Sequence, residues 1–97
     1  MSKHQLHFNT CRALTNLYIK KNHDYGDSFG KGYKEYGLIM PVIRLEDKFN
    51  RFKQLTKQEA EVKDETIIDT LMDLCNYSIM TIIEIQLSKE PECKEVL

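Results

Sequence analysis

The chain of 97 residues has no tryptophan, two prolines and only three cysteines, the residues that build disulfide and metal-thiolate scaffolds. The cysteines are Cys11, Cys75 and Cys93, an odd number of widely separated residues without a C-x-x-C pair. This spacing excludes a self-contained disulfide framework and a cysteine-based zinc site. It is typical of proteins that fold in a reducing cytosol.

A long uninterrupted apolar run is also missing. The N-terminal residues Met-Ser-Lys-His-Gln are not followed by the apolar segment of a signal peptide. The longest apolar stretch, residues 67–87, contains Asp69, Asp73 and Glu84, which a membrane span would tolerate poorly. We therefore expect a soluble, cytoplasmic protein.

Net charge is nearly absent, at −1, but the total hides an asymmetry. Residues 1–57 carry eleven Lys and Arg against five Asp and Glu, whereas residues 58–97 carry three against ten. A basic half followed by an acidic half indicates binding chemistry. The composition, 41% hydrophobic and 30% charged, is that of a folded domain. Because a chain this short buries only a small core, we expect a homo-oligomer.

The apolar spacing predicts an all-α protein, since no stretch shows the alternation of a β-strand. We expect a small helical bundle of three main helices plus one short helical piece before Gly37, completed by oligomerisation. The main helices are predicted over residues 3–22, from about Pro41 to residue 55, and over 65–88.

The segments between these helices carry turn and cap signals. Three glycines with Asx and Ser residues predict a loop over 22–32, and a polar connection is expected over 57–63. Asp64 is the predicted N-cap of the last helix. The single domain would span residues 1–88, followed by a flexible C-terminal tail over 89–97.

The last predicted helix carries a polar stripe on an otherwise apolar circumference. Glu65, Asp69, Asp73 and Asn76 fall within about 80° on a helical wheel. Three carboxylates one turn apart repel one another, so cations must compensate them wherever they lie near a core. Lys or Arg from another helix would do so, as would Mg²⁺ or Mn²⁺, which all-oxygen clusters favour. A solvated helix face remains the third alternative.

The preceding helix offers the opposite charge. Arg44, Asp47, Lys48 and Arg51 form one contiguous stripe at i, i+3, i+4 and i+7. Two arginines on one helix face can fork onto the oxygens of a phosphate. The alternative is that the stripe forms ion pairs with Asp69 and Asp73 and so holds the two helices together.

The glycine-rich segment supplies a third set of polar side chains. Its G-x-x-x-G-K-G run lacks the spacing, the terminal Ser or Thr and the preceding strand of a phosphate-binding P-loop. Functional residues concentrate on loops, and Tyr25 could stack on a base. The candidate ligand-binding residues here are Lys21, His23, Asp24, Tyr25 and Ser28. Turn formation alone is the competing explanation for them.

Three ordered blocks identify a resemblance. The segments KNHDYGDSF at 21–29, RLEDKFNR at 44–51 and VKDETIIDTLMDLCNY at 62–77 resemble the nucleotide-modification-associated domain family. The likeness covers about residues 10–87, and the family occurs in bacteriophages and some bacteria. It implies a nucleotide or nucleotide-derived small molecule as partner, and the host cytoplasm as location if a phage encodes the chain.

The chain is more distantly similar to the all-α MazG/dUTPase-like nucleoside triphosphate pyrophosphohydrolases, which hold Mg²⁺ between acidic helices. That similarity implies a metal site of Asp47, Glu65, Asp69 and Asp73, with Asp69 and Asp73 as the catalytic residues. The pattern departs from those enzymes, since the acidic spacing is E-x-x-x-D-x-x-x-D and the earlier helix has R-x-x-D-K-x-x-R.

Three functions follow from these observations. The first is a Mg²⁺-dependent nucleotide (pyro)phosphohydrolase, in which Arg44, Lys48 and Arg51 neutralise the phosphates and Tyr25 and Asp24 recognise the base or sugar. The second is a non-catalytic nucleotide sponge, an anti-defence protein that sequesters a host immune signalling nucleotide. The third is a helical inhibitor of a host protein. Nucleic acid is not expected as a partner, because the basic stripe is short and alternates with carboxylates.

Overall fold

The computed structural model describes residues 1–57 and 63–90, and of residues 63–65 only the backbone. Within these ranges the chain forms helices and no strand, which confirms the all-α prediction. The helices are α1 (Lys3–Tyr25), α2 (Ser28–Tyr36), α3 (Ile39–Leu55) and α4 (Lys63–Lys89). They correspond to the three main helices and the short helical piece expected from the sequence.

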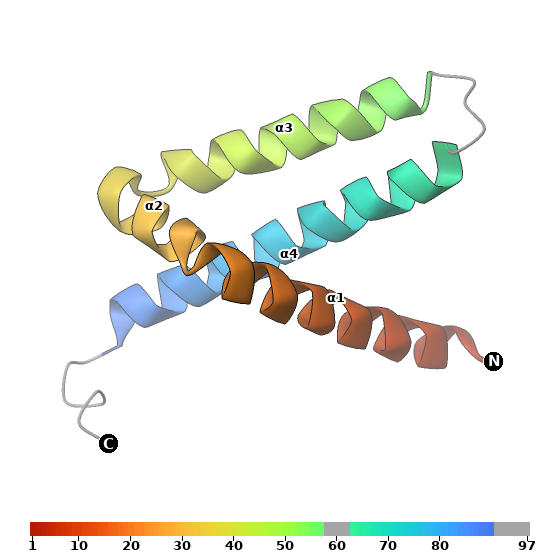
Figure 1. Cartoon of the computed structure of the whole chain (residues 1–97), viewed down its shortest axis with the longest axis horizontal. Helices are drawn as coiled ribbons and strands as arrows, with labels where there is room; N and C mark the ends of the chain where they lie inside the picture. The colour runs from red at the N-terminus through yellow and green to blue at the C-terminus, as the bar shows by residue number, and fades with distance from the viewer. Residues whose placement is uncertain (58–62, 91–97) are drawn as a thin grey trace.

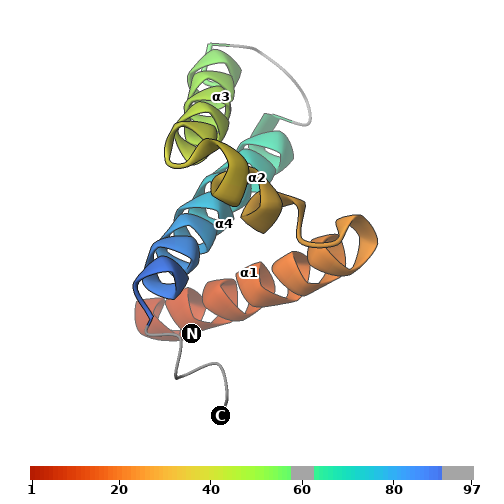
Figure 2. The same cartoon turned by 90° about the vertical axis from the view of Figure 1, so that its left-hand side faces the viewer.

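The helices form an open arrangement around α4. Helices α3 and α4 lie side by side and run in opposite directions, and α1 crosses α4 (Figure 1). The short α2 connects α1 to α3 and touches both α3 and α4 (Figure 2). Residues 1–13 are all exposed, so the first half of α1 extends away from the other helices.

The core of the described chain is small and is spread along the contacts that α4 makes with the other helices. Its buried apolar side chains are Leu14, Phe29, Pro41 and Leu55. Two polar residues of α4, Thr70 and Asn76, are also buried, with 2% and 8% of their surface exposed. The interior is therefore a junction between helices, and most of the long α4 is left uncovered.

The turn between α1 and α2 is shorter than the sequence predicts. Helix α1 continues to Tyr25, and α2 begins at Ser28, so the predicted loop over 22–32 is wrong except at Gly26 and Asp27. Gly26 has φ 65° and ψ −163°, a conformation that is essentially restricted to glycine. Asp27 then caps α2 by accepting a hydrogen bond from the Gly30 amide at 3.2 Å. One glycine and one cap complete the reversal, so Gly30 and Gly32 lie within α2, and Gly37 follows that helix with φ 69°.

Two further boundaries differ from the prediction. Helix α4 begins at Lys63, so Asp64 lies in its first turn and is not the cap. It ends at Lys89, one residue inside the predicted tail. Most of the predicted connection, over 58–62, and the rest of that tail, over 91–97, lie outside the described residues.

Helix α4 has an unusual apolar character. Its segment Thr66–Lys89 is long and apolar enough to cross a membrane, by length and composition only. One such helix is weak evidence for a span, and three carboxylates interrupt this one. The described chain thus gives no firm indication of a membrane protein.

Candidate functional site

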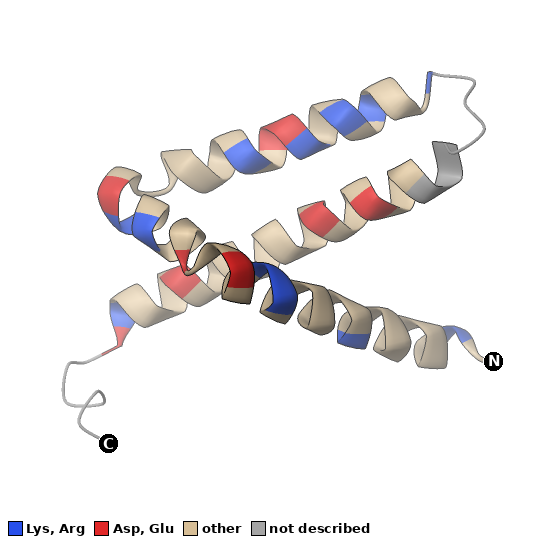
Figure 3. Ribbon diagram, viewed as in Figure 1, with Lys and Arg blue, Asp and Glu red and all other residues tan. Residues whose placement is uncertain are grey.

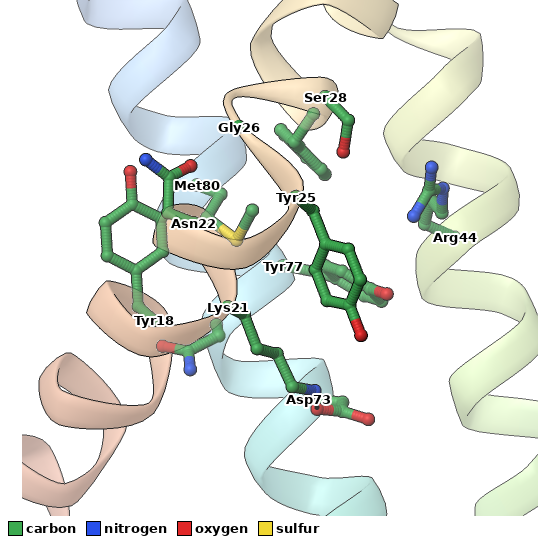
Figure 4. Close-up of a pocket in the computed structure, with 12 residues that line it drawn as sticks. Tyr18, Lys21, Asn22, Tyr25, Gly26, Ser28, Arg44, Asp73, Tyr77 and Met80 are labelled. Atoms are coloured by element: carbon green, nitrogen blue, oxygen red, sulfur yellow. Dashed lines mark hydrogen bonds and ion pairs between the residues drawn. The ribbon is translucent and has the colours of Figure 1, made fainter.

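A pocket of about 310 Å³ opens where the end of α1, the α1–α2 turn, α3 and α4 converge. Figure 4 shows tyrosines from α1 and α4, Arg44 on α3 and the Lys21–Asp73 contact around it. The lining residues are Tyr18, Lys21, Asn22, Tyr25, Gly26, Ser28, Phe29, Arg44, Asp73, Asn76, Tyr77 and Met80. The pocket thus combines aromatic rings with cationic and amide groups.

The aromatic part of the pocket is centred on Tyr77. Its ring stacks on the buried ring of Phe29, with the centroids 5.9 Å apart and an interplanar angle of 15°. This stacking orients Tyr77, because aromatic pairs prefer specific offset geometries. Tyr18 and Tyr25 stand on α1 at spacing i and i+7, and Tyr25 keeps 73% of its surface exposed. Tyr25 therefore offers an exposed π face to a planar ligand.

Arg44 brings a positive charge to these rings. Its Cζ lies 5.8 Å from the centroid of the Tyr77 ring, within the range of a cation–π contact. The side chain is exposed, and no carboxylate within the described chain forms an ion pair with it. The guanidinium is thus held at the pocket while its charge remains available to an anion.

A second charged group closes one side of the pocket. Asp73 of α4 accepts from Lys21 Nζ of α1 on Oδ1 at 3.1 Å, and from Lys48 Nζ of α3 on Oδ2 at 2.9 Å. Both lysines therefore compensate one carboxylate across three helices, where Figure 3 shows opposite charges on α3 and α4. Partial burial by itself would raise the pKa of Asp73, but the hydrogen bonds and charges of Lys48 and Lys21 outweigh it and lower this pKa.

The lowered pKa predicts how acid affects stability. A carboxylate whose pKa is lower in the folded than in the unfolded protein stabilises the fold at pH values above its ordinary pKa, near 3.8. This stabilisation is lost as the pH falls below 3.8 and through the lower pKa of the folded state. We expect Asp73→Asn to lower the free energy of unfolding by about 1 kcal/mol at pH 7, because the ion pairs are only partly buried. The difference from the wild type should shrink below pH 4 in urea titrations. Asp69→Asn, which removes an exposed carboxylate from the same helix, is the matched control. An equal effect of both variants would contradict the assignment.

Asn76 joins α1 to α4 at the base of the pocket. Its Nδ2 donates to the main-chain carbonyl of Leu14 at 3.1 Å, and both residues are buried. A buried amide must be hydrogen-bonded, so this bond sets the position at which α1 crosses α4. It therefore also sets the position of the tyrosines and Lys21 of α1.

The structure brings together part of the predicted ligand-binding set. The predicted residues that line the pocket are Lys21, Tyr25, Ser28, Arg44 and Asn76, joined by Asp73. Lys48 lies behind Asp73 and contacts it, and Arg51 is exposed two turns along α3 from Arg44. His23 and Asp24 point elsewhere: they are 87% and 69% exposed and contact each other at 3.4 Å.

Several pocket residues were not predicted: Tyr18, Asn22, Gly26, Phe29, Tyr77 and Met80. Helical spacing could have indicated two of them, because Tyr18 precedes Lys21 by three positions and Tyr77 follows Asp73 by four. Phe29 belongs to the segment 22–32 that the sequence predicts to be a loop, so no helical periodicity pointed to it.

The predicted metal ligands do not form a cluster in the part of the chain that the structure describes. No three His, Cys, Asp or Glu side chains there are close enough to hold an ion. Asp47 and Asp69 are exposed, and both oxygens of Asp73 are bound by lysines. The described side chains therefore do not form a metal site. The side chain of Glu65 is not among them, so the predicted site of four carboxylates stays a prediction.

Comparison with known proteins gives one match. The family described as nucleotide modification associated domain 1 matches residues 21–85, a narrower segment than the resemblance seen in the sequence. This segment runs from Lys21 through most of α4 and contains every pocket residue except Tyr18. No curated protein and no solved structure matches the chain.

Proposed function

The chain belongs to the nucleotide modification associated domain 1 family, and we propose that it binds a nucleotide or nucleotide-derived small molecule in the pocket between its four helices. The observation that carries this proposal is Arg44, an exposed cation beside the ring of Tyr77 without a carboxylate partner in the described chain. Every nucleotide presents the same two chemistries, an aromatic base and an anionic phosphate.

In this proposal each side of the pocket has a role. The exposed ring of Tyr25 would stack on the base, an interaction worth about 1–3 kcal/mol per base. Arg44 would fork onto phosphate oxygens, as guanidinium groups do. A volume of about 310 Å³ lies at the small end of ligand pockets, which suits one nucleotide unit. Lys21 also lines the pocket. Its ammonium group is paired with Asp73, and a bound phosphate would compete with that carboxylate for it.

We prefer binding without catalysis to the predicted phosphohydrolase. A Mg²⁺ ion held by Asp73 would have to displace Lys21 and Lys48, which already compensate that carboxylate. Hydrolysis by analogy with the MazG/dUTPase-like enzymes needs Asp47, Glu65, Asp69 and Asp73 around one ion. Sequestration of a host signalling nucleotide by a phage protein is one role that binding alone would serve.

A thermal-shift screen tests the proposal. Nucleoside triphosphates, dinucleotides and cyclic nucleotides are each added with Mg²⁺ and, separately, with EDTA. A specific ligand at 100 times its Kd stabilises a protein by about 2.7 kcal/mol, which for a chain of this size raises the Tm by roughly 13 °C. We expect such a shift in both conditions, with the ligand recovered intact by chromatography.

The other outcomes separate the alternatives. A shift that EDTA abolishes, together with release of a nucleoside monophosphate or pyrophosphate, would support the hydrolase. No shift with any nucleotide would contradict both, and would favour a helical inhibitor whose charge stripes serve only as interhelical ion pairs.

A further inference from the structure

Helix α4 carries an apolar stripe on the face that points away from the pocket. Its members are Ile68, Leu71, Cys75, Ile79 and Ile82, which fall within about 80° at 100° per residue. The stripe is centred about 180° from Asp73 and Tyr77, which lie at the pocket. We refer to these five residues as the back stripe.

The back stripe is exposed to solvent. The exposed fractions of Ile68, Leu71, Ile79 and Ile82 are 57%, 37%, 44% and 54%, and Cys75 is exposed as well. No charged residue of α4 between Ile68 and Gln86 falls on this arc. A contiguous apolar surface on a small chain with few buried apolar residues marks an interaction site.

The order of residues in the back stripe is symmetric. Counted from Cys75, the other members stand at −7, −4, +4 and +7, and all four are Ile or Leu. When two copies of such a stripe run antiparallel, each residue meets its counterpart on the opposite side of the centre. A two-fold interface requires this self-complementarity, since the same patch must serve both subunits.

We propose that the back stripe is covered by α4 of a second copy of this chain, antiparallel, with a two-fold axis at Cys75. Ile68 then packs on the partner's Ile82, and Leu71 packs on the partner's Ile79. The stripe extends about 21 Å along the helix. The pockets of the two copies lie on opposite outer sides of the dimer, so ligand binding and dimerisation use separate faces.

A lipid bilayer is a poorer occupant for this stripe. Asp69, Asp73 and Glu84 lie on the other faces of the same helix, and inserting them into hydrocarbon is costly. The symmetry of the stripe about Cys75 is required by a two-fold interface, whereas contact with a bilayer does not require it. Burial of the stripe by a partner helix leaves those carboxylates and the pocket in water.

Paired substitutions on α4 test the interface. We expect the wild type to have twice the 11.4 kDa chain mass by light scattering, and Ile82→Glu to have the mass of one chain. Leu87→Glu is the matched control, because Leu87 is 53% exposed on the same helix but lies off the stripe. It should remain dimeric. Circular dichroism establishes that both variants keep their helices.

A charge reversal tests the orientation. Ile68→Lys alone should dissociate the dimer, but the double variant Ile68→Lys, Ile82→Glu should restore it, because the introduced opposite charges meet across the two-fold axis. The two positions lie about 21 Å apart within one chain and cannot pair there. A parallel dimer would not be restored, and that result would overturn the proposed geometry.

Cross-linking supplies an independent measurement. In the variant Cys11→Ser, Cys93→Ser, oxidation with copper phenanthroline should join two chains through a Cys75 disulfide, and the further change Cys75→Ser should abolish the product. A monomeric wild type that sediments with phosphatidylcholine vesicles would overturn the proposal in favour of a lipid surface. A monomeric wild type without vesicle binding would overturn it outright.

Discussion

Replacing Arg44 with alanine should weaken nucleotide binding by about tenfold to a hundredfold. A hydrogen bond to a charged group contributes about 1.5–3 kcal/mol, and each 1.4 kcal/mol is a factor of ten in Kd. Arg44 is the one arginine that lines the described pocket, and its guanidinium is held beside Tyr77. Isothermal titration with the nucleotide that gives the largest thermal shift measures the loss.

Arg51→Ala is the matched control for this change. Arg51 lies two turns further along the same helix, is exposed, and does not line the pocket, so its removal should change Kd by less than twofold. Arg44→Lys should recover only part of the affinity, because an ammonium group cannot fork onto two oxygens. Equal losses in Arg44→Ala and Arg51→Ala would place the ligand along the whole basic stripe, outside the pocket described above.

Replacing Asn76 with aspartate should destabilise the protein by about 3–5 kcal/mol at pH 7. The new side chain has nearly the same shape, but it places an uncompensated charge at a site with 8% exposure, against the carbonyl oxygen of Leu14. The Nδ2 donor that joins α4 to α1 is lost at the same time. Urea denaturation followed by circular dichroism measures the effect.

The pH dependence of this variant identifies the cause. Burial raises the pKa of a carboxyl group, and the protonated form can again donate to Leu14. The difference from the wild type should therefore decrease as the pH is lowered towards 4. Asn16→Asp makes the same chemical change at an exposed position of α1 and should cost less than 0.5 kcal/mol. A small, pH-independent effect of Asn76→Asp would show that the bond to Leu14 does not hold α1.

The helices were predictable because their signals are local. Apolar spacing predicted α3 and α4 to within about two residues, and Pro41 in the first turn of α3 was expected. The end of α1 was misjudged because three glycines near one another indicated a loop. Of these three glycines only Gly26 has a positive φ, and the buried Gly30 lies within α2 beside the cap residue Asp27. The other positive φ is at Gly37, directly after α2.

The charges were predicted as stripes, but their pairing was not. The sequence left open whether Lys48 and the arginines would meet the carboxylates of the last helix or a phosphate. In the structure Lys48 and Lys21 form ion pairs with Asp73, whereas Arg44 lies beside the ring of Tyr77. Of the basic residues on α3, Lys48 thus stabilises the contact with α4, whereas Arg44 remains available to an anion. That division depends on the angle at which α3 meets α4, which spacing along one helix does not contain.

Local periodicity was sufficient for an all-α chain, for its three long helices and for the basic and acidic faces of α3 and α4, because these depend on residues within a few turns of each other. The pocket depended on long-range contacts. Asn76 and Leu14 are 62 positions apart, and Lys21 and Asp73 are 52 apart. Only the crossing of α1 over α4 brings Tyr18 and Tyr25 to the pocket that Tyr77 and Arg44 line. The two helices are joined there by burial, by the Asn76–Leu14 hydrogen bond and by the Lys21–Asp73 ion pair.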